Sequence, residues 1–211
     1  MKLLATALLI SAVLFVCTFS ATGTTNSTAA TATSKIEPVT AINAESEEVY
    51  TGTIVNTNGR MATAGFTLRL KGFTSDDDFS HYLGILAEGD QFDVLKAIKN
   101  VDLGSFTPTR DVARQISVAR KTSLPDGSTR IVVAFERWLK FAEVRNGYRS
   151  EDYPFAILEV IFDTNGKGAG TYIAACAVDL ERDKKSGQFK LELENFGTYP
   201  SKVIGVSRRD K

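Results

Sequence analysis

Short β-prone segments separated by tight-turn sequences run through most of this chain, and this pattern constrains the fold more than any other feature. Near the start, the dipeptide Asn58-Gly59 separates residues 48–57 from residues 60–73. Both residues of that dipeptide tolerate the positive φ angles that a two-residue hairpin turn requires. In the second segment apolar and polar residues alternate, which places the apolar ones on one face of a strand. The sequence therefore predicts a β-hairpin here.

The later part of the chain repeats this pattern. Short turns connect its strands, which predicts an antiparallel meander. One segment, 156–162, is apolar on both faces apart from Glu159, as expected of a central strand, whereas 189–193 alternates as a half-exposed strand does. The predicted strands of this part are 112–122, 129–144, 155–163, 171–180, 188–195 and 202–207.

Two helices are predicted between the first hairpin and the later strands. Ser75 precedes three aspartates and an apolar pattern of helical spacing, so it suits the N-cap of the first helix. A second short helix is expected to start at Asp90, with Phe92, Leu95 and Ile98 on one side. The predicted fold class is α+β, an antiparallel β meander with two short helices inserted after the first hairpin. An open curved sheet and a closed barrel both fit the pattern.

The first 22 residues have the pattern of a secretory signal peptide. Lys2 precedes an uncharged, apolar run from residue 3 to residue 16. Two alternatives remain open, an uncleaved membrane anchor and a lipoprotein signal acylated at Cys17. We expect a secreted or periplasmic protein of bacterial type that contacts membrane only through this segment, if it stays uncleaved. Residues 23–45 are rich in Thr, Ala and Ser and predict a flexible linker, which leaves 46–211 as a single domain.

Charge and cysteine content exclude several functions. Lys and Arg number 25 and Asp and Glu number 25, so the chain gives no electrostatic reason to expect nucleic acid as a partner. Because Cys17 lies in the signal, Cys176 is alone in the mature domain, and its apolar neighbours predict a buried thiol rather than a nucleophile.

Two motifs resemble chemical sites without meeting their requirements. The glycine-rich segment 163–170 lacks the spacing of calcium-loop ligands and no helix follows it, so a hairpin turn is expected. His81 is the one histidine of the chain, and a single histidine does not form the usual metal cluster. We therefore expect no metal, no cofactor and no catalytic residues.

The connection 145–155 carries two tyrosines, two arginines and two acidic residues. Tyrosine and arginine in a loop are typical of recognition surfaces. The predicted binding residues are Tyr148, Arg149, Asp152 and Tyr153, which we expect to face outward while the flanking strands anchor the loop. The alternative is that the tyrosines fold back over the edge of the sheet and the charges remain solvated.

Three segments together resemble a family of exported bacterial proteins of unknown function. They are Tyr153-Pro154-Phe155, the glycine-rich turn at 163–171, and the sequence from Glu194 to Pro200. The resemblance spans most of residues 50–209. It implies export and a shared fold, and it implies no activity.

We expect a non-catalytic binding or structural module of the cell envelope or exterior whose partner is another protein or an envelope component. One alternative is a barrel-like carrier of a small apolar ligand. A hydrolase is the least favoured alternative, because the usual catalytic residues are missing or unplaced. An internal apolar cavity would favour the carrier, whereas a filled core would favour the binding module.

Overall fold

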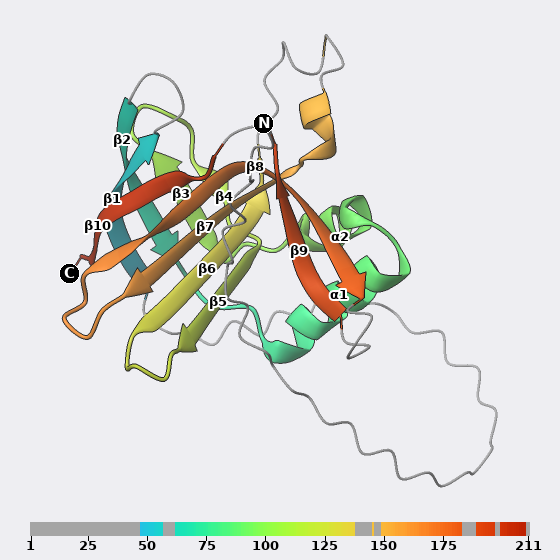
Figure 1. Cartoon of the computed structure of the whole chain (residues 1–211), viewed down its shortest axis with the longest axis horizontal. Helices are drawn as coiled ribbons and strands as arrows, with labels where there is room; N and C mark the ends of the chain where they lie inside the picture. The colour runs from blue at the N-terminus through green and yellow to red at the C-terminus, as the bar shows by residue number, and fades with distance from the viewer. Residues whose placement is uncertain are drawn as a thin grey trace, which may run out of the picture. The chain divides into compact units, whose positions relative to one another are not determined.

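The computed structural model describes residues 47–56, 62–137, 145, 149–182, 189–196 and 199–209. These residues form one antiparallel sheet of ten strands together with two α-helices (Figure 1). The predicted α+β class is confirmed. The predicted signal, the linker and the Asn58-Gly59 turn lie outside the described residues.

The described part of the chain forms ten strands, two α-helices and one short 3-10 turn. They are β1 (Glu48–Asn56), β2 (Ala62–Leu70), α1 (Asp76–Glu88), α2 (Gln91–Ile98), β3 (Gly104–Pro108), β4 (Arg114–Gln115), β5 (Val118–Ser123), β6 (Thr129–Glu136), the 3-10 turn η1 (Arg149–Asp152), β7 (Phe155–Phe162), β8 (Gly168–Arg182), β9 (Phe189–Asn195) and β10 (Ser201–Arg208).

The strand order is β4-β3-β2-β1-β10-β8-β7-β6-β5, and β9 pairs with β8 outside this path. β1 and β2 form the predicted hairpin, with Glu48 opposite Leu70. Between β4 and β5, which stand at the two ends of the order, the chain contains only Ile116 and Ser117. The sheet therefore curls until its ends are adjacent, yet no ladder joins β4 to β5. It is a curved sheet and is not closed.

The curled region corrects the predicted strand boundaries. The single strand expected at 112–122 is divided into β4 and β5, because Ile116 turns inward and is fully buried. β3 was missed, since its sequence combines Gly, Ser, Thr and Pro. Its first residue, Gly104, has φ of 135°, and a Cβ there would lie 2.0 Å from the carbonyl oxygen of Arg69, so only glycine fits. β6 ends at Glu136, before the predicted end at 144.

Side chains fill the space inside the curl. Phe106 of β3 is fully buried and lies 5.3 to 5.4 Å, between ring centroids, from Phe66, Phe135 and Tyr172. These aromatic contacts join β2, β6 and β8 to β3 across the interior. The sheet is held in its curved form by burial of apolar surface on its concave face.

A second apolar cluster lies between the helices and the opposite face of β7 and β8. Leu86, Val94 and Ile98 of the helices pack against strand residues that include Ile157 and Ile173. β7 is covered on both faces for this reason, which confirms its prediction as a central strand. Its charged residue, Glu159, forms an ion pair with Arg130 of β6.

The buried face of α2 differs from the predicted one. Val94 and Ile98, four residues apart, are buried, whereas Phe92 is 41% exposed. The face of α2 that packs on the sheet is the one formed by Val94 and Ile98, which lie about one turn apart. Phe92 is not part of that face.

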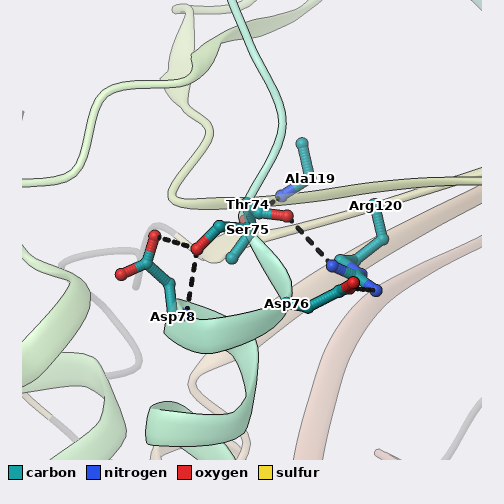
Figure 2. Close-up of polar contacts among 6 residues, drawn as sticks. All are labelled: Thr74, Ser75, Asp76, Asp78, Ala119 and Arg120. Atoms are coloured by element: carbon teal, nitrogen blue, oxygen red, sulfur yellow. Dashed lines mark hydrogen bonds and ion pairs between the residues drawn. The ribbon is translucent and has the colours of Figure 1, made fainter. Parts of the chain in front are cut away.

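The predicted N-cap of α1 is present, and Asp90, where the second helix was predicted to start, caps α2. The Ser75 hydroxyl accepts a hydrogen bond from the Asp78 N–H at 3.0 Å, and the Asp90 carboxylate accepts from the Phe92 N–H at 2.8 Å. Figure 2 shows the first of these caps. Each cap satisfies an N–H group that the first turn of a helix leaves without a backbone partner.

The residues beside the first cap tie α1 to β5 (Figure 2). Thr74 and Ala119 exchange two hydrogen bonds, from the Thr74 N–H to the Ala119 carbonyl at 2.8 Å and from the Ala119 N–H to the Thr74 hydroxyl at 3.0 Å. Arg120 donates to the Thr74 carbonyl at 3.0 Å and reaches the carboxylate of Asp76 at 2.5 Å. The start of α1 is therefore fixed at one end of the sheet order.

Within the described ranges, no helix is both long enough and apolar enough to cross a membrane.

Candidate binding cleft

A surface cleft of about 430 Å³ opens where the end of α2 approaches the segment around β4 and the end of β6. Leu95 and Ile98 form an apolar wall from α2. The polar lining comes from three separate parts of the chain and includes three cationic side chains and one carboxylate. These residues are Lys99, Arg114, Arg137 and Glu136.

Arg114 enters the cleft from β4 and is largely covered by its surroundings. Its side chain is 18% exposed, and its guanidinium lies 3.5 Å from the carboxylate of Asp111. Burial raises the pKa of nearby Tyr172 to about 12, and the positive charge of Arg114 opposes that rise. Arg114 is therefore a mostly buried cation that also lines the cleft.

Arg137 follows β6 and is held by the segment before β7. Its backbone N–H donates to the Pro154 carbonyl at 2.8 Å, and its Nε donates to the Tyr153 carbonyl at 2.6 Å. Two bonds to consecutive carbonyl groups fix both the backbone and the direction of the side chain. The cleft is therefore connected directly to the loop that the sequence predicts as the binding surface.

The wall formed by β4 is also fixed. The Gln115 side-chain amide donates to the Val101 carbonyl at 2.7 Å, which links β4 to the segment after α2. The Ile116 N–H donates to the Gly104 carbonyl at 2.9 Å, and the Ser117 N–H donates to the Ala134 carbonyl at 3.3 Å. A cleft whose walls are joined by such bonds keeps its shape when a ligand enters, which lowers the entropic cost of binding.

The predicted binding residues that the structure describes lie in different environments. Tyr148 lies outside the described residues. Arg149 begins η1, and Asp152 ends it with an exposed side chain. The Asp152 carbonyl accepts a hydrogen bond from the Gln91 side chain at 2.8 Å, so the base of the loop is tied to the start of α2.

Tyr153 contradicts the expectation that it faces outward. It is 6% exposed, its hydroxyl donates to the Glu194 carboxylate at 2.6 Å, and its ring lies 4.9 Å from that of Phe196. The alternative, in which a tyrosine folds back over the sheet, is correct for this residue. The reason is that β9 and the residue after it supply both an aromatic surface and an acceptor, which the local sequence of the loop does not reveal.

The cationic cleft was missed by sequence reasoning. Lys99, Arg114 and Arg137 lie in three separate segments, and no sequence motif links them. Only the curling of the sheet and the packing of α2 bring them around one space. No local pattern in the sequence would have found them.

Other groups with chemical potential lie away from the cleft. His81 is exposed on α1, with its ring 6.1 Å from that of Tyr82. Cys176 is fully buried as predicted, and burial, with a further contribution from Glu194, raises the pKa of its thiol to about 12. Among the residues that the structure describes, no group of three or more His, Cys, Asp or Glu side chains could hold a metal ion.

Comparison of the chain with protein-family models, with curated proteins and with solved structures gave no match.

Proposed function

We propose that this protein is an exported binding module of the cell envelope or exterior, and that it binds an anionic group in the cleft between α2, β4 and the end of β6. The observation that carries the proposal is the convergence of Lys99, Arg114 and Arg137 on one cleft. The whole chain has a formal net charge of +0, so the gathering of three cationic side chains in one place is not a consequence of composition.

The size and chemistry of the cleft suit a small ligand that carries carboxylate or phosphate groups. Its volume of about 430 Å³ falls within the range of about 300 to 1,000 Å³ that small-molecule sites occupy. Guanidinium groups present several donors in a plane that matches a carboxylate or phosphate. Leu95, which is only partly buried, provides apolar contact for the rest of the ligand.

The packed interior of the sheet supports a binding module in preference to the alternative of an apolar carrier. The concave face is occupied by large side chains, among which Phe106 and Phe135 are at most 1% exposed. The cleft itself lies outside this interior, and six of its nine lining residues are charged or polar.

Export rests on the sequence of residues 1–22, where Lys2 precedes an uncharged apolar run, and on the resemblance to exported bacterial proteins. Intact-mass measurement of the protein expressed in a bacterium tests it. We expect the first twenty or so residues to be absent. A full-length mass in the soluble cytoplasmic fraction would contradict export, and a lipid-modified product that begins at Cys17 would identify a lipoprotein.

Titration by NMR tests the binding site. Inorganic phosphate and citrate are added separately at constant ionic strength, and we expect shift changes at Lys99, Gln115 and the residues around them. The variant Lys99→Gln should weaken the response several-fold. Lys96→Gln is the matched control, because Lys96 is an exposed cation of α2, three residues before Lys99, that pairs with Asp93 and lies outside the cleft.

Two results would contradict the proposed site. The first is the absence of shift changes around the cleft with either probe. The second is an equal loss of affinity in Lys99→Gln and Lys96→Gln, which would indicate a diffuse electrostatic effect rather than a defined site.

A further inference from the structure

β9 is an edge strand in the part of the chain that the structure describes. It pairs with residues 176–182 of β8 and with no other described strand. The ladder between β7 and β8 ends at the pair Phe155 and Cys176, so the last residues of β8 continue with β9 as a two-stranded ribbon beyond the main sheet. Figure 1 shows this ribbon, in orange and red, on the side of the sheet where α1 and α2 lie.

The two edges of this ribbon differ in their hydrogen bonding. On the β8 edge, the Val178 N–H donates to the Gln91 side-chain carbonyl at 3.0 Å. Along the outer edge of β9, no described strand accepts or donates. A row of backbone groups that lacks a ladder partner is a template for another strand.

One face of β9 is apolar and incompletely covered. Leu191 and Leu193 lie opposite Leu180 and Val178, which pack against the helix cluster. Leu191 is 39% exposed and Leu193 is 36% exposed. Two large apolar side chains beside an open strand edge would gain from further burial.

The other face of β9 carries an unbalanced charge pattern. Lys190 lies opposite Glu181, but Glu192 lies opposite Asp179. Like charges that face each other across a ladder are destabilising. Among the described residues, no cation forms an ion pair with Glu192, so a positive charge on the far side of β9 would compensate this pair.

We propose that two copies of this chain associate by antiparallel pairing of their β9 edges about a two-fold axis at Leu191. Leu191 then lies opposite Leu191 of the second copy. Lys190 of each copy lies opposite Glu192 of the other, which supplies the missing cation on both sides of the axis. The apolar faces of the two ribbons become continuous, and each open edge is closed by the other.

The sequence of β9 selects this register. An axis between two residues places leucines opposite charged residues, because side chains alternate between faces. An axis at Lys190 or at Glu192 places that residue opposite its own copy, and an axis at Leu193 places Glu192 opposite Glu194. Leu191 is the only central position at which opposed charges are complementary and leucine meets leucine.

Charge reversal tests the pairing without removing apolar surface. Sedimentation velocity of the whole protein over a range of concentrations should show a monomer–dimer equilibrium. In the proposed dimer, Lys190 of each copy lies opposite Glu192 of the other. Lys190→Glu makes both of these pairs acidic, and Glu192→Lys makes both of them basic. Each variant alone should therefore dimerise at least about tenfold more weakly than the original protein.

A mixture of the two variants provides the decisive result. In a mixed dimer, both pairs join an acidic residue of one variant to a lysine of the other, so association should return. Lys167→Glu is the matched control, since it makes the same change of charge at an exposed position in the β7–β8 turn, and it should dimerise normally. Circular dichroism melting curves establish that each variant is folded.

Three results would overturn the inference: a monomer at every concentration, dimerisation of Lys190→Glu equal to that of the original protein, or a mixture that associates no better than its components. The first would show that these charges protect the edge from association. Phosphate and citrate titrations of the same variants keep this test separate from the proposed cleft, because their response depends on residues outside β9.

Discussion

Tyr153, in the segment that leads into β7, donates its hydroxyl hydrogen to the carboxylate of Glu194 in β9 over 2.6 Å. The two residues are separated by 41 positions in the sequence. Their hydrogen bond joins the base of the predicted binding loop to the ribbon formed by β8 and β9. It therefore makes Tyr153 a structural residue, although it occupies a loop sequence typical of recognition surfaces.

Removal of this hydrogen bond should lower stability measurably. Tyr153→Phe keeps the ring against Phe196 but loses the hydroxyl, and we expect a loss of about 1 kcal/mol in the free energy of unfolding. Urea denaturation of Tyr153→Phe, Glu194→Gln and the double variant measures the coupling. Independent, additive effects would contradict the observed contact. Replacement of Tyr148 and Arg149 together by Ala is the comparison, for which the sequence predicts a change below about 0.5 kcal/mol.

Glu48 should make stability depend on pH in the acid range. The residue is 8% exposed, and burial opposes its ionisation. Hydrogen bonds from Tyr50 and Lys121, at 2.8 and 3.0 Å, together with the charges of Lys121 and Arg208, outweigh burial and lower the pKa of the carboxyl below its usual range. The resulting stabilisation is fully present above the unfolded-state pKa of about 4.3 and is lost as pH falls through the lower folded-state value.

The variant Glu48→Gln tests this dependence. At pH 7 it should reduce the free energy of unfolding by about 1 to 3 kcal/mol, because a buried charged acceptor is lost. The difference from the original protein should shrink at acid pH. Glu47→Gln is the control, since Glu47 lies 3.8 Å from Arg69 with both side chains more than a third exposed, and it should change stability by less than about 1 kcal/mol. A constant difference across pH would contradict the assignment.

Cys176 should be inert in the folded protein. Its thiol is fully buried, and its raised pKa leaves almost no thiolate at neutral pH. We expect labelling by a thiol reagent only after unfolding, and a melting temperature that reducing agent does not change. Fast labelling of the native protein would show that the thiol is reachable.

Cys176→Ser should destabilise the protein less than burial of an unpartnered hydroxyl would. The Cys176 sulfur lies 3.2 Å from the Ala177 carbonyl oxygen, to which the serine hydroxyl could donate. We expect a loss at the lower end of the range of about 1 to 3 kcal/mol in denaturant unfolding. A loss well above that range would mean that the hydroxyl does not reach this acceptor.

The contacts at the start of α1 should contribute to stability through two separate groups. Ser75→Ala removes the N-cap and should lower the free energy of unfolding by about 1 kcal/mol, whereas Ser80→Ala, at an exposed position of the same helix, should have little effect. Thr74→Val leaves the Ala119 N–H without its acceptor and should lower stability by about 1 to 3 kcal/mol. Equal effects of Ser75→Ala and Ser80→Ala in thermal and urea unfolding would exclude a role for the cap.

The features that the sequence predicted correctly depend on neighbours along the chain. Ser75 and Asp90 cap helices because their side chains reach N–H groups two or three residues away. The alternation in β2 and β9 and the apolar character of β7 follow from the period of a strand. The hairpin turn between β7 and β8 likewise rests on local conformational preferences, with the Asp163 carboxylate accepting from the backbone of residues 165 and 167.

The tertiary structure alone decided where the curled sheet brings distant segments together. Tyr153 is buried because β9 lies beside it, and β10 stands between β1 and β8, which no local pattern encodes. The cleft exists because α2, β4 and the end of β6 meet, and no sequence pattern links the three cations that line it. Local chemistry determined the elements of this protein. Burial of apolar surface on both faces of the sheet, a property of the whole chain, determined which side chains meet.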